Sequence, residues 1–262
     1  MESGRNTNKA PAFKHIVSTL MPSFLIILLI GIWVFASNRN SVLVPSPVTV
    51  IQRFIKTFTH PINNQLIWGH IWASLKRVLL ALLISCGIGI PFGILIGWNR
   101  TFNAIFGTLF EVLRPIPPIA WMPLIIMLLG IGEVPKVVIV FIGTFTPIVL
   151  NTATSIRLVD ALYLDVGRMF NANERQLLFH IALPASLTSI FAGFRTATSG
   201  GLMVVMAAEM IGAKAGLGFL IQRGLDAFDI PLIMVGMIVI GLVGSALAVL
   251  TDFLERWITH GR

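Results

Sequence analysis

Glu111, Arg114 and Glu209 are ionisable side chains in or beside apolar segments, where an unpaired charge is costly. Glu111 and Arg114 are three residues apart, so a helix would let them form an ion pair. Alternatively, Arg114 offers its fork of donors to an anion. Glu209 allows two similar interpretations, structural pairing or a position beside a path or gate. The chemistry that these residues support is the recognition of charge.

Patterns for catalysis or metal binding are absent from the sequence. No G-x-x-x-x-G-K-[ST] phosphate-binding loop occurs, and the run from Gly212 to Gly216 lacks its spacing. Histidines and carboxylates do not recur at the spacing of metal ligands, and His180 is interpreted as a surface helix residue. We therefore expect that the chain is not an enzyme and binds no metal or cofactor of its own.

Long apolar segments carry the residues named above. Hydrophobic residues make up 56% of the 262 positions and charged residues 11%, which is more apolar than a soluble domain requires. Each of six segments is near or above the roughly 20 residues that cross a bilayer. They cover residues 17–36, 75–97, 104–130, 135–156, 186–210 and 232–252. The sequence predicts an all-α polytopic membrane protein, with residues 1–262 in one transmembrane domain.

The distribution of Lys and Arg predicts which parts face the cytoplasm. Basic residues are denser in the tail 1–16, around Arg100, in the loop 157–185 and near the C-terminus, so these parts are predicted to be cytoplasmic. An even number of spans agrees with both ends lying on that side. The N-terminal apolar run is too long for a signal peptide and is interpreted as a retained first span.

The segments 37–74 and 211–231 are then predicted to lie outside. Within the first, residues 48–58 form a short amphipathic stretch suited to the outer membrane surface. The second is interpreted as an outer loop facing a binding partner. The net charge of +8 shows no basic stripe with interleaved aromatics, so no nucleic-acid partner is expected.

Small residues recur at four-residue intervals in three segments, where they let helix backbones approach closely. They are Gly89, Gly93 and Gly97, then Gly193, Ala197 and Gly201, then Gly236, Gly244 and Ala248. Ordinary helix packing and surfaces that slide during opening are both compatible with this pattern. Ser199, Gly200 and Gly201 also lie near the middle of their segment, where transporters often place substrate contacts.

Three prolines interrupt the segment 104–130. Pro115, Pro117 and Pro118 cannot all lie in an unbroken helix, because proline lacks the backbone N–H and its ring collides with the preceding turn. We predict a kink or a re-entrant start to this segment, beside Arg114.

A polar loop separates the fourth and fifth apolar segments. It reads Asp165-Val166-Gly167-Arg168-Met169-Phe170-Asn171, followed by nine residues and then Ile181-Ala182-Leu183-Pro184. The spacing resembles the cytoplasmic coupling motif of ATP-binding-cassette (ABC) importer permeases. Asp165 stands where that motif has Glu, and Asn171 stands where it has Gly, although Asn tolerates a left-handed turn well.

Further runs resemble the permease subunits of type I ABC importers, in the branch that serves sulfonates, taurine, nitrate or bicarbonate. They are Leu43-Val44-Pro45-Ser46-Pro47, the run from Arg114 to Leu124, and Ala207-Ala208-Glu209-Met210 with Gly216-Leu217-Gly218. The second run looks most like taurine and aliphatic sulfonate permeases. With the loop, these runs cover nearly the whole chain.

The resemblance implies a bacterial inner-membrane importer in which two copies of the permease form one pathway. Two cytoplasmic ATPase subunits would bind ATP and Mg, and an extracytoplasmic solute-binding protein would deliver a small solute. Two copies are hypothesised to pack through the glycine-rich faces. Candidate pathway residues are Arg114, Ser199, Gly200, Gly201 and Glu209.

The motif match assigns the ATPase coupling site to eight residues: Asp165, Gly167, Met169, Phe170, Asn171, Ile181, Leu183 and Pro184. Residues 160–171 are predicted to form a short helix, and Leu183-Pro184 to end a second one. Met169 and Phe170 suit insertion into a groove on an ATPase, with anchoring to the membrane surface as the alternative. A secondary transporter and a membrane anchor or sensor stay open as other classes of function.

Overall fold

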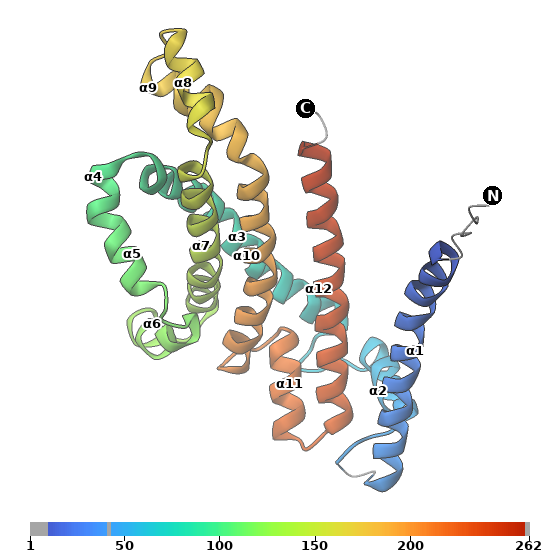
Figure 1. The fold of residues 1–262 in the computed structure, drawn as a ribbon. Coiled ribbons are helices and arrows are strands. Elements are labelled where there is room, and N and C mark those ends of the chain that lie inside the picture. Colours follow the sequence, from blue (N-terminus) through green and yellow to red (C-terminus); the bar gives the residue numbers. More distant parts are fainter. Residues whose placement is uncertain (1–9, 41–42, 260–262) are drawn as a thin grey trace, which may run out of the picture.

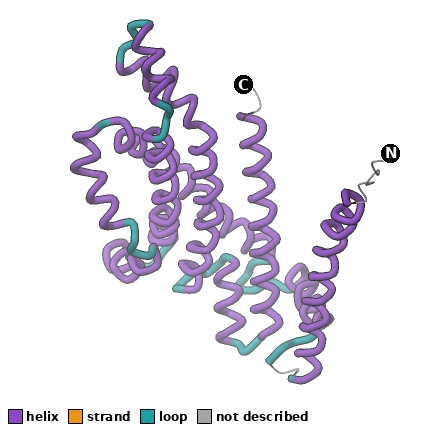
Figure 2. The backbone as a smooth tube through the Cα atoms, viewed as in Figure 1, coloured by secondary structure: helices purple, strands orange, loops and turns teal. Residues whose placement is uncertain are grey.

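Helices form nearly all of the structure, a computed structural model that describes residues 10–40 and 43–259 (Figures 1 and 2). The α-helices are α1 (Ala10–Arg39), α2 (Pro47–Thr59), α3 (Ile67–Trp98), α4 (Arg100–Phe102), α5 (Thr108–Leu113), α6 (Met122–Leu129), α7 (Glu133–Arg157), α8 (Ala161–Met169), α9 (Glu174–Gln176), α10 (Leu183–Met210), α11 (Leu217–Asp226) and α12 (Ile230–Thr259). The predicted all-α fold is confirmed. Of the predicted tail 1–16, residues 1–9 lie outside the described residues, and the rest begins α1.

Four helices in the described part are long and apolar enough to cross a membrane. They are Ile67–Trp98, Glu133–Arg157, Glu174–Met210 and Ile230–Trp257, and a bent pair of helices would make a fifth. In α1 the described apolar stretch, Phe24–Arg39, is shorter than these spans. All six predicted segments are therefore helical, while the number of crossings and the side on which each end lies stay predictions.

The proline run breaks the third predicted segment in its middle. Arg100–Leu113 and Pro118–Leu129 meet at an angle of 90°, with Pro117 in an extended conformation between them. The predicted kink is present, but it follows α5 instead of starting the segment. Each proline removes a backbone donor, and Pro118 disfavours the helical region for Pro117, whose ψ is 136°, so the helix is broken here. Figure 1 shows α5 and α6 beside α7.

Glycines let α3, α7 and α10 pack closely within this chain. A Cβ atom at Gly93 of α3 would lie 2.7 Å from Cβ of Thr152 on α7, and one at Gly201 of α10 would lie 2.7 Å from Cγ2 of Thr144. The close approach predicted from the small residues is thus found, but the neighbours are helices of the same chain. The hypothesis that a second copy packs on these faces is wrong at both positions, because they are already filled.

The helices α2 and α11 form a second packing unit with α12. Val50 of α2, Leu220 of α11 and Val235 of α12 are buried together. Arg53 and Asp229 join α2 to the turn before α12 through an ion pair of 2.7 Å. The segment expected to be an outer loop therefore contains a helix, since Leu220 and its neighbours give α11 an apolar face that α12 covers.

The glycine packing predicts different effects of the same substitution at two adjacent positions. Gly201→Leu should lower the free energy of unfolding by about 1–3 kcal/mol through overpacking against Thr144. Gly200→Leu should have little effect, because nothing lies within 4 Å of a Cβ at that position. Unfolding of the purified chain by SDS titration in mixed micelles measures both. Equal loss of stability in the two variants would contradict the described packing.

Candidate functional site

The polar loop folds as a short helix that ends in a sharp reversal. The Asp160 side chain caps α8 by accepting a hydrogen bond of 2.9 Å from the N–H of Leu162. At the other end Asn171 has a φ of 57°, in the left-handed region where a chain leaves a helix. The N–H of Ala172 then donates to the carbonyl of Gly167 at 3.1 Å. The predicted helix and the predicted role of Asn171 in the reversal are both found.

Met169 and Phe170 stand at the tip of this loop, with 83% and 84% of their surfaces exposed. Asp165 and Arg168 form an exposed ion pair of 2.9 Å on the same helix. Two large apolar side chains that nothing in the described chain covers form a surface suited to a partner. In Figure 1, α8 and α9 project beyond the ends of the neighbouring helices.

Gly167 holds α8 against the second half of the loop. It is buried, and a Cβ atom there would lie 2.6 Å from both Ile181 Cδ1 and Leu177 Cδ2. A side chain at this position would require the Ile181 and Leu177 side chains to shift. Of the motif residues, Met169 and Phe170 thus form an exposed apolar tip, and Gly167 and Ile181 form a close contact behind it.

The second loop helix does not end at Leu183-Pro184, which corrects the prediction made from the sequence. Asn173 and Gln176 form a capping box at the start of α9, and the helix continues through a π-helical turn, Leu177–Ala182, into α10. The N–H of Leu183 donates to the carbonyl of Leu178, five residues back. This wider turn accommodates the proline, so the ring need not break the helix.

A second polar group lies at the far end of α10. Glu209 is fully buried, and its carboxylate accepts hydrogen bonds from Arg77 Nη1 at 2.5 Å, Ser74 Oγ at 2.7 Å and the N–H of Gly218 at 2.9 Å. These donors come from α3 and α11. A buried carboxylate needs such partners because it has lost its hydration.

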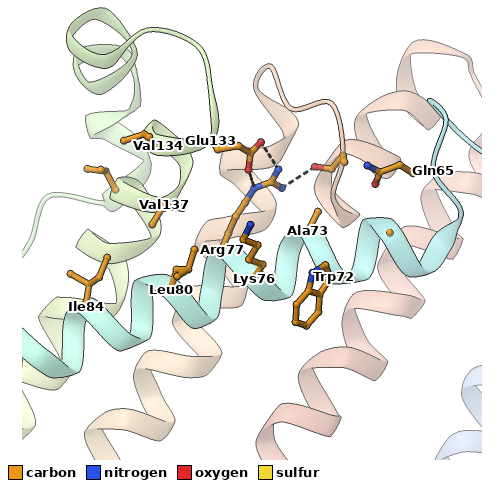
Figure 3. A pocket seen from close by; sticks show the side chains of 13 residues that line it. Gln65, Trp72, Ala73, Lys76, Arg77, Leu80, Ile84, Glu133, Val134 and Val137 are labelled. Atoms are coloured by element: carbon orange, nitrogen blue, oxygen red, sulfur yellow. Dashed lines mark hydrogen bonds and ion pairs between the residues drawn. The ribbon is translucent and has the colours of Figure 1, made fainter.

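Arg77 joins this carboxylate to α7. Its Nε and Nη2 atoms each donate to Glu133 at 2.7 Å, and Nη1 also donates to the carbonyl of Ala215 at 2.8 Å. Figure 3 shows the guanidinium between Glu133 and the backbone before α11. Sequence reasoning missed Arg77 and Glu133. The signal available was that Arg77, Glu133 and Glu209 each lie close to an end of a different apolar segment.

Two glycines make room for the buried carboxylate. Gly216 has a φ of 134°, and a Cβ atom there would collide with the carboxylate of Glu209. A Cβ atom at Gly218 would collide with the carbonyl of Met206. The Gly216-Leu217-Gly218 run therefore packs closely around Glu209.

The candidate pathway residues are not gathered at one place. Arg114 is exposed at the end of α5, and among the described residues it forms no ion pair with Glu111. On α10, Ser199 is exposed and Gly201 is buried, while a Cβ atom at Gly200 would meet open space. Glu209 has the structural pairing that was one of its two interpretations. A position along a pathway stays a prediction for all five residues.

Over residues 10–40 and 43–259, no group of three or more His, Cys, Asp or Glu side chains is placed to hold a metal ion.

Comparisons with known proteins define the class. Residues 89–261 match the family described as "Binding-protein-dependent transport system inner membrane component". A putative ABC transporter permease of Methanocaldococcus jannaschii is 36% identical over 80% of this chain and 79% of its own length. The taurine transport system permease TauC of Escherichia coli is 30% identical over 93% of this chain and 90% of its own.

The nitrate import permease NrtB of Synechocystis is likewise 30% identical, over 93% of this chain and 90% of its own length. Among solved structures, the inward-facing MetNI methionine ABC transporter aligns with a TM-score of 0.61 at 18% identity, covering 73% of this chain and 97% of that one. This likeness supports the fold. The chain is thus a multi-pass transporter component of the bacterial inner membrane. It belongs to the family of binding-protein-dependent permeases of ABC transporters.

The buried carboxylate predicts a large loss of stability when its charge is removed alone. Glu209→Met leaves Arg77 without one partner and should lower the free energy of unfolding by about 3–5 kcal/mol. The double variant with Met at both positions should cost less than Glu209→Met and Arg77→Met added together, because no buried charge is left unpaired. Asp165→Ala, which breaks an exposed pair, should cost less than about 1 kcal/mol. SDS titration of the four variants tests this, and additive losses at Glu209 and Arg77 would refute the coupling.

Proposed function

We propose that this chain is the membrane permease of an ATP-driven importer of a small anionic solute. In this proposal two copies enclose the path, two cytoplasmic ATPase subunits bind ATP and Mg, and a solute-binding protein delivers the solute from outside. The observation that carries the proposal is the projecting α8 with its exposed Met169 and Phe170, in a chain that belongs to the ABC permease family.

The loop is suited to receive a movement from an ATPase. Met169 and Phe170 supply an apolar tip, and burying two such side chains on a partner stabilises a complex by roughly 1.5–3 kcal/mol each. The contact of Gly167 with Ile181 fixes the tip to the helix that leads into α10. Hydrolysis itself would take place on the partner, since this chain offers no phosphate-binding loop.

Two alternatives to an ATPase contact at the tip can be distinguished by experiment. Anchoring to the membrane surface would leave ATPase binding independent of Phe170, and a secondary transporter would have no ATPase to bind. Copurification of an ATPase with this chain in stoichiometric amount distinguishes the importer from both.

We expect Phe170→Asp to release the ATPase or to uncouple its hydrolysis from import, because a carboxylate cannot enter an apolar groove without losing its hydration. Phe228→Asp is the matched control. Phe228 is 91% exposed in the turn between α11 and α12, away from α8, so ATPase recovery should be unchanged. The readouts are recovery of the ATPase with tagged permease and solute uptake into vesicles. Wild-type recovery and uptake with Phe170→Asp would defeat the proposal.

A small anion is proposed as the solute for two reasons. The relatives TauC and NrtB are named for taurine and nitrate, each of which bears an anionic group. Arg114 also lies at the proline break of the third segment with its guanidinium not paired to Glu111 in the described structure. A free guanidinium at membrane depth supplies positive potential and donors to an anion.

Arg114→Gln should therefore lower uptake about tenfold or more, which corresponds to losing a hydrogen bond to a charged group of roughly 1.5–3 kcal/mol. Glu111→Gln, three residues away, should leave uptake near wild type. Uptake of radiolabelled taurine, nitrate and bicarbonate into vesicles, with ATPase recovery as an assembly check, tests both. Unchanged uptake with assembled Arg114→Gln, or a binding protein whose ligand is a cation, would rule out this role.

A further inference from the structure

A groove of about 720 Å³ opens between the first half of α3 and the start of α7. Its lining includes Trp72, Lys76, Leu80 and Ile84 on α3, and Val134 and Val137 on α7. Figure 3 shows Leu80 and Ile84 following Lys76 along α3, opposite Val134 and Val137. Along α3 the charged residues Lys76 and Arg77 thus lie near the middle of the lining, with Trp72 on one side and Leu80 and Ile84 on the other.

The charged part of the groove has one more cation than it has carboxylates. Arg77 is bound by Glu133 and Glu209, and Lys136 donates to the carbonyl of Gly132 at 2.7 Å with Glu133 nearby. Three cations face two carboxylates, so one positive charge remains when Lys76 is included. Lys76 is exposed and, in the described structure, has neither an ion pair nor a hydrogen bond. The charged part of the groove therefore suits a ligand group with a single negative charge.

The apolar walls are not covered by the rest of the chain. Trp72, Leu80 and Val134 expose 61%, 40% and 62% of their surfaces. A small hydrophilic anion would gain nothing from these walls. An occupant that carries a long apolar group would bury them, at roughly 25 cal/mol for each Å² removed from water.

The part of the groove from Lys76 to Ile84 has about the length of one leaflet of a bilayer. No charged residue occurs from Val78 to Trp98, so Lys76 and Arg77 mark the end of the apolar part of α3. Lys76 and Ile84 are eight residues apart, or about 12 Å along a helix. Half of a hydrocarbon core is about 15 Å. Lys76 would lie at the level of the lipid head groups, with Ile84 near the level of the acyl-chain ends.

We propose that this groove binds an anionic phospholipid. The phosphodiester lies against Lys76, and one acyl chain runs between Leu80 and Ile84 on α3 and Val137 on α7. This site is separate from the ATPase contact, whereas Arg77 in its lining also binds Glu209, one of the candidate pathway residues. The proposal holds whether or not the solute is an anion. A bound lipid would also cover the outer side of the helix pair that Arg77 and Glu133 connect.

Native mass spectrometry of the full chain, purified in detergent and titrated with phosphatidylglycerol, tests the proposal. Lys76→Gln and Leu80→Trp, which fills the groove, should each weaken the lipid adduct about tenfold. Lys56→Gln, at an exposed lysine on α2 outside the groove, is the matched control and should bind as wild type does. Phosphatidylcholine should bind more weakly than phosphatidylglycerol, and inorganic phosphate should not compete.

Several results would overturn the proposal. Absence of an adduct in the wild type, or equal binding by Lys56→Gln and Lys76→Gln, would show that no specific lipid site exists here. Competition by inorganic phosphate, with no effect of Leu80→Trp, would identify a site for a free anion instead. Loss of permease dimers in Leu80→Trp, with lipid binding unchanged, would assign the groove to a second copy. Circular dichroism of each variant checks that the helices form.

Discussion

The Arg77 guanidinium is the point at which three spans are fixed to one another. It lies on α3, binds Glu209 at the end of α10, and binds Glu133 at the start of α7 with two hydrogen bonds. Separating Arg77 from Glu209 is costly because both side chains are buried, whereas the Glu133 side chain is 66% exposed and can be hydrated. Glycine is needed at position 216 because the Glu209 carboxylate occupies the space of a side chain there, and at position 218 because Met206 and Glu209 lie too close.

The same arrangement explains the different character of the two ends of the molecule. Near Arg77, charges are paired inside the protein and the helices are held together. At α8, by contrast, Met169 and Phe170 are uncovered and Asp165 with Arg168 forms only an exposed pair. Since Arg77 is fully engaged, its neighbour Lys76 is left as the cation that can meet a ligand from the membrane. Charges are thus paired within the protein at the Arg77 end, whereas the α8 end exposes apolar side chains that a partner can cover.

Local features were predictable from the sequence, whereas long-range pairings were not. Hydropathy located the helices, and Asp160 and Asn171 located the start and the reversal of α8, because caps depend on residues close in the chain. Glu209 could not be assigned to Arg77, which is 132 positions away, without the packing of α3 on α10. Glycine spacing indicated close contact but not the partner. Pro184 indicated a helix end, yet the π-helical turn before it made one unnecessary.

The uninterrupted run of helix from Glu174 to Met210 has a mechanical consequence. Its 37 residues correspond to a rod of about 55 Å, which begins beside the apolar tip of the loop and ends at Glu209. A tilt of this helix about its loop end would displace its other end the most. The buried pair of Glu209 and Arg77 lies at that other end. Opening the bundle would require that ion pair to move with the rod or to break.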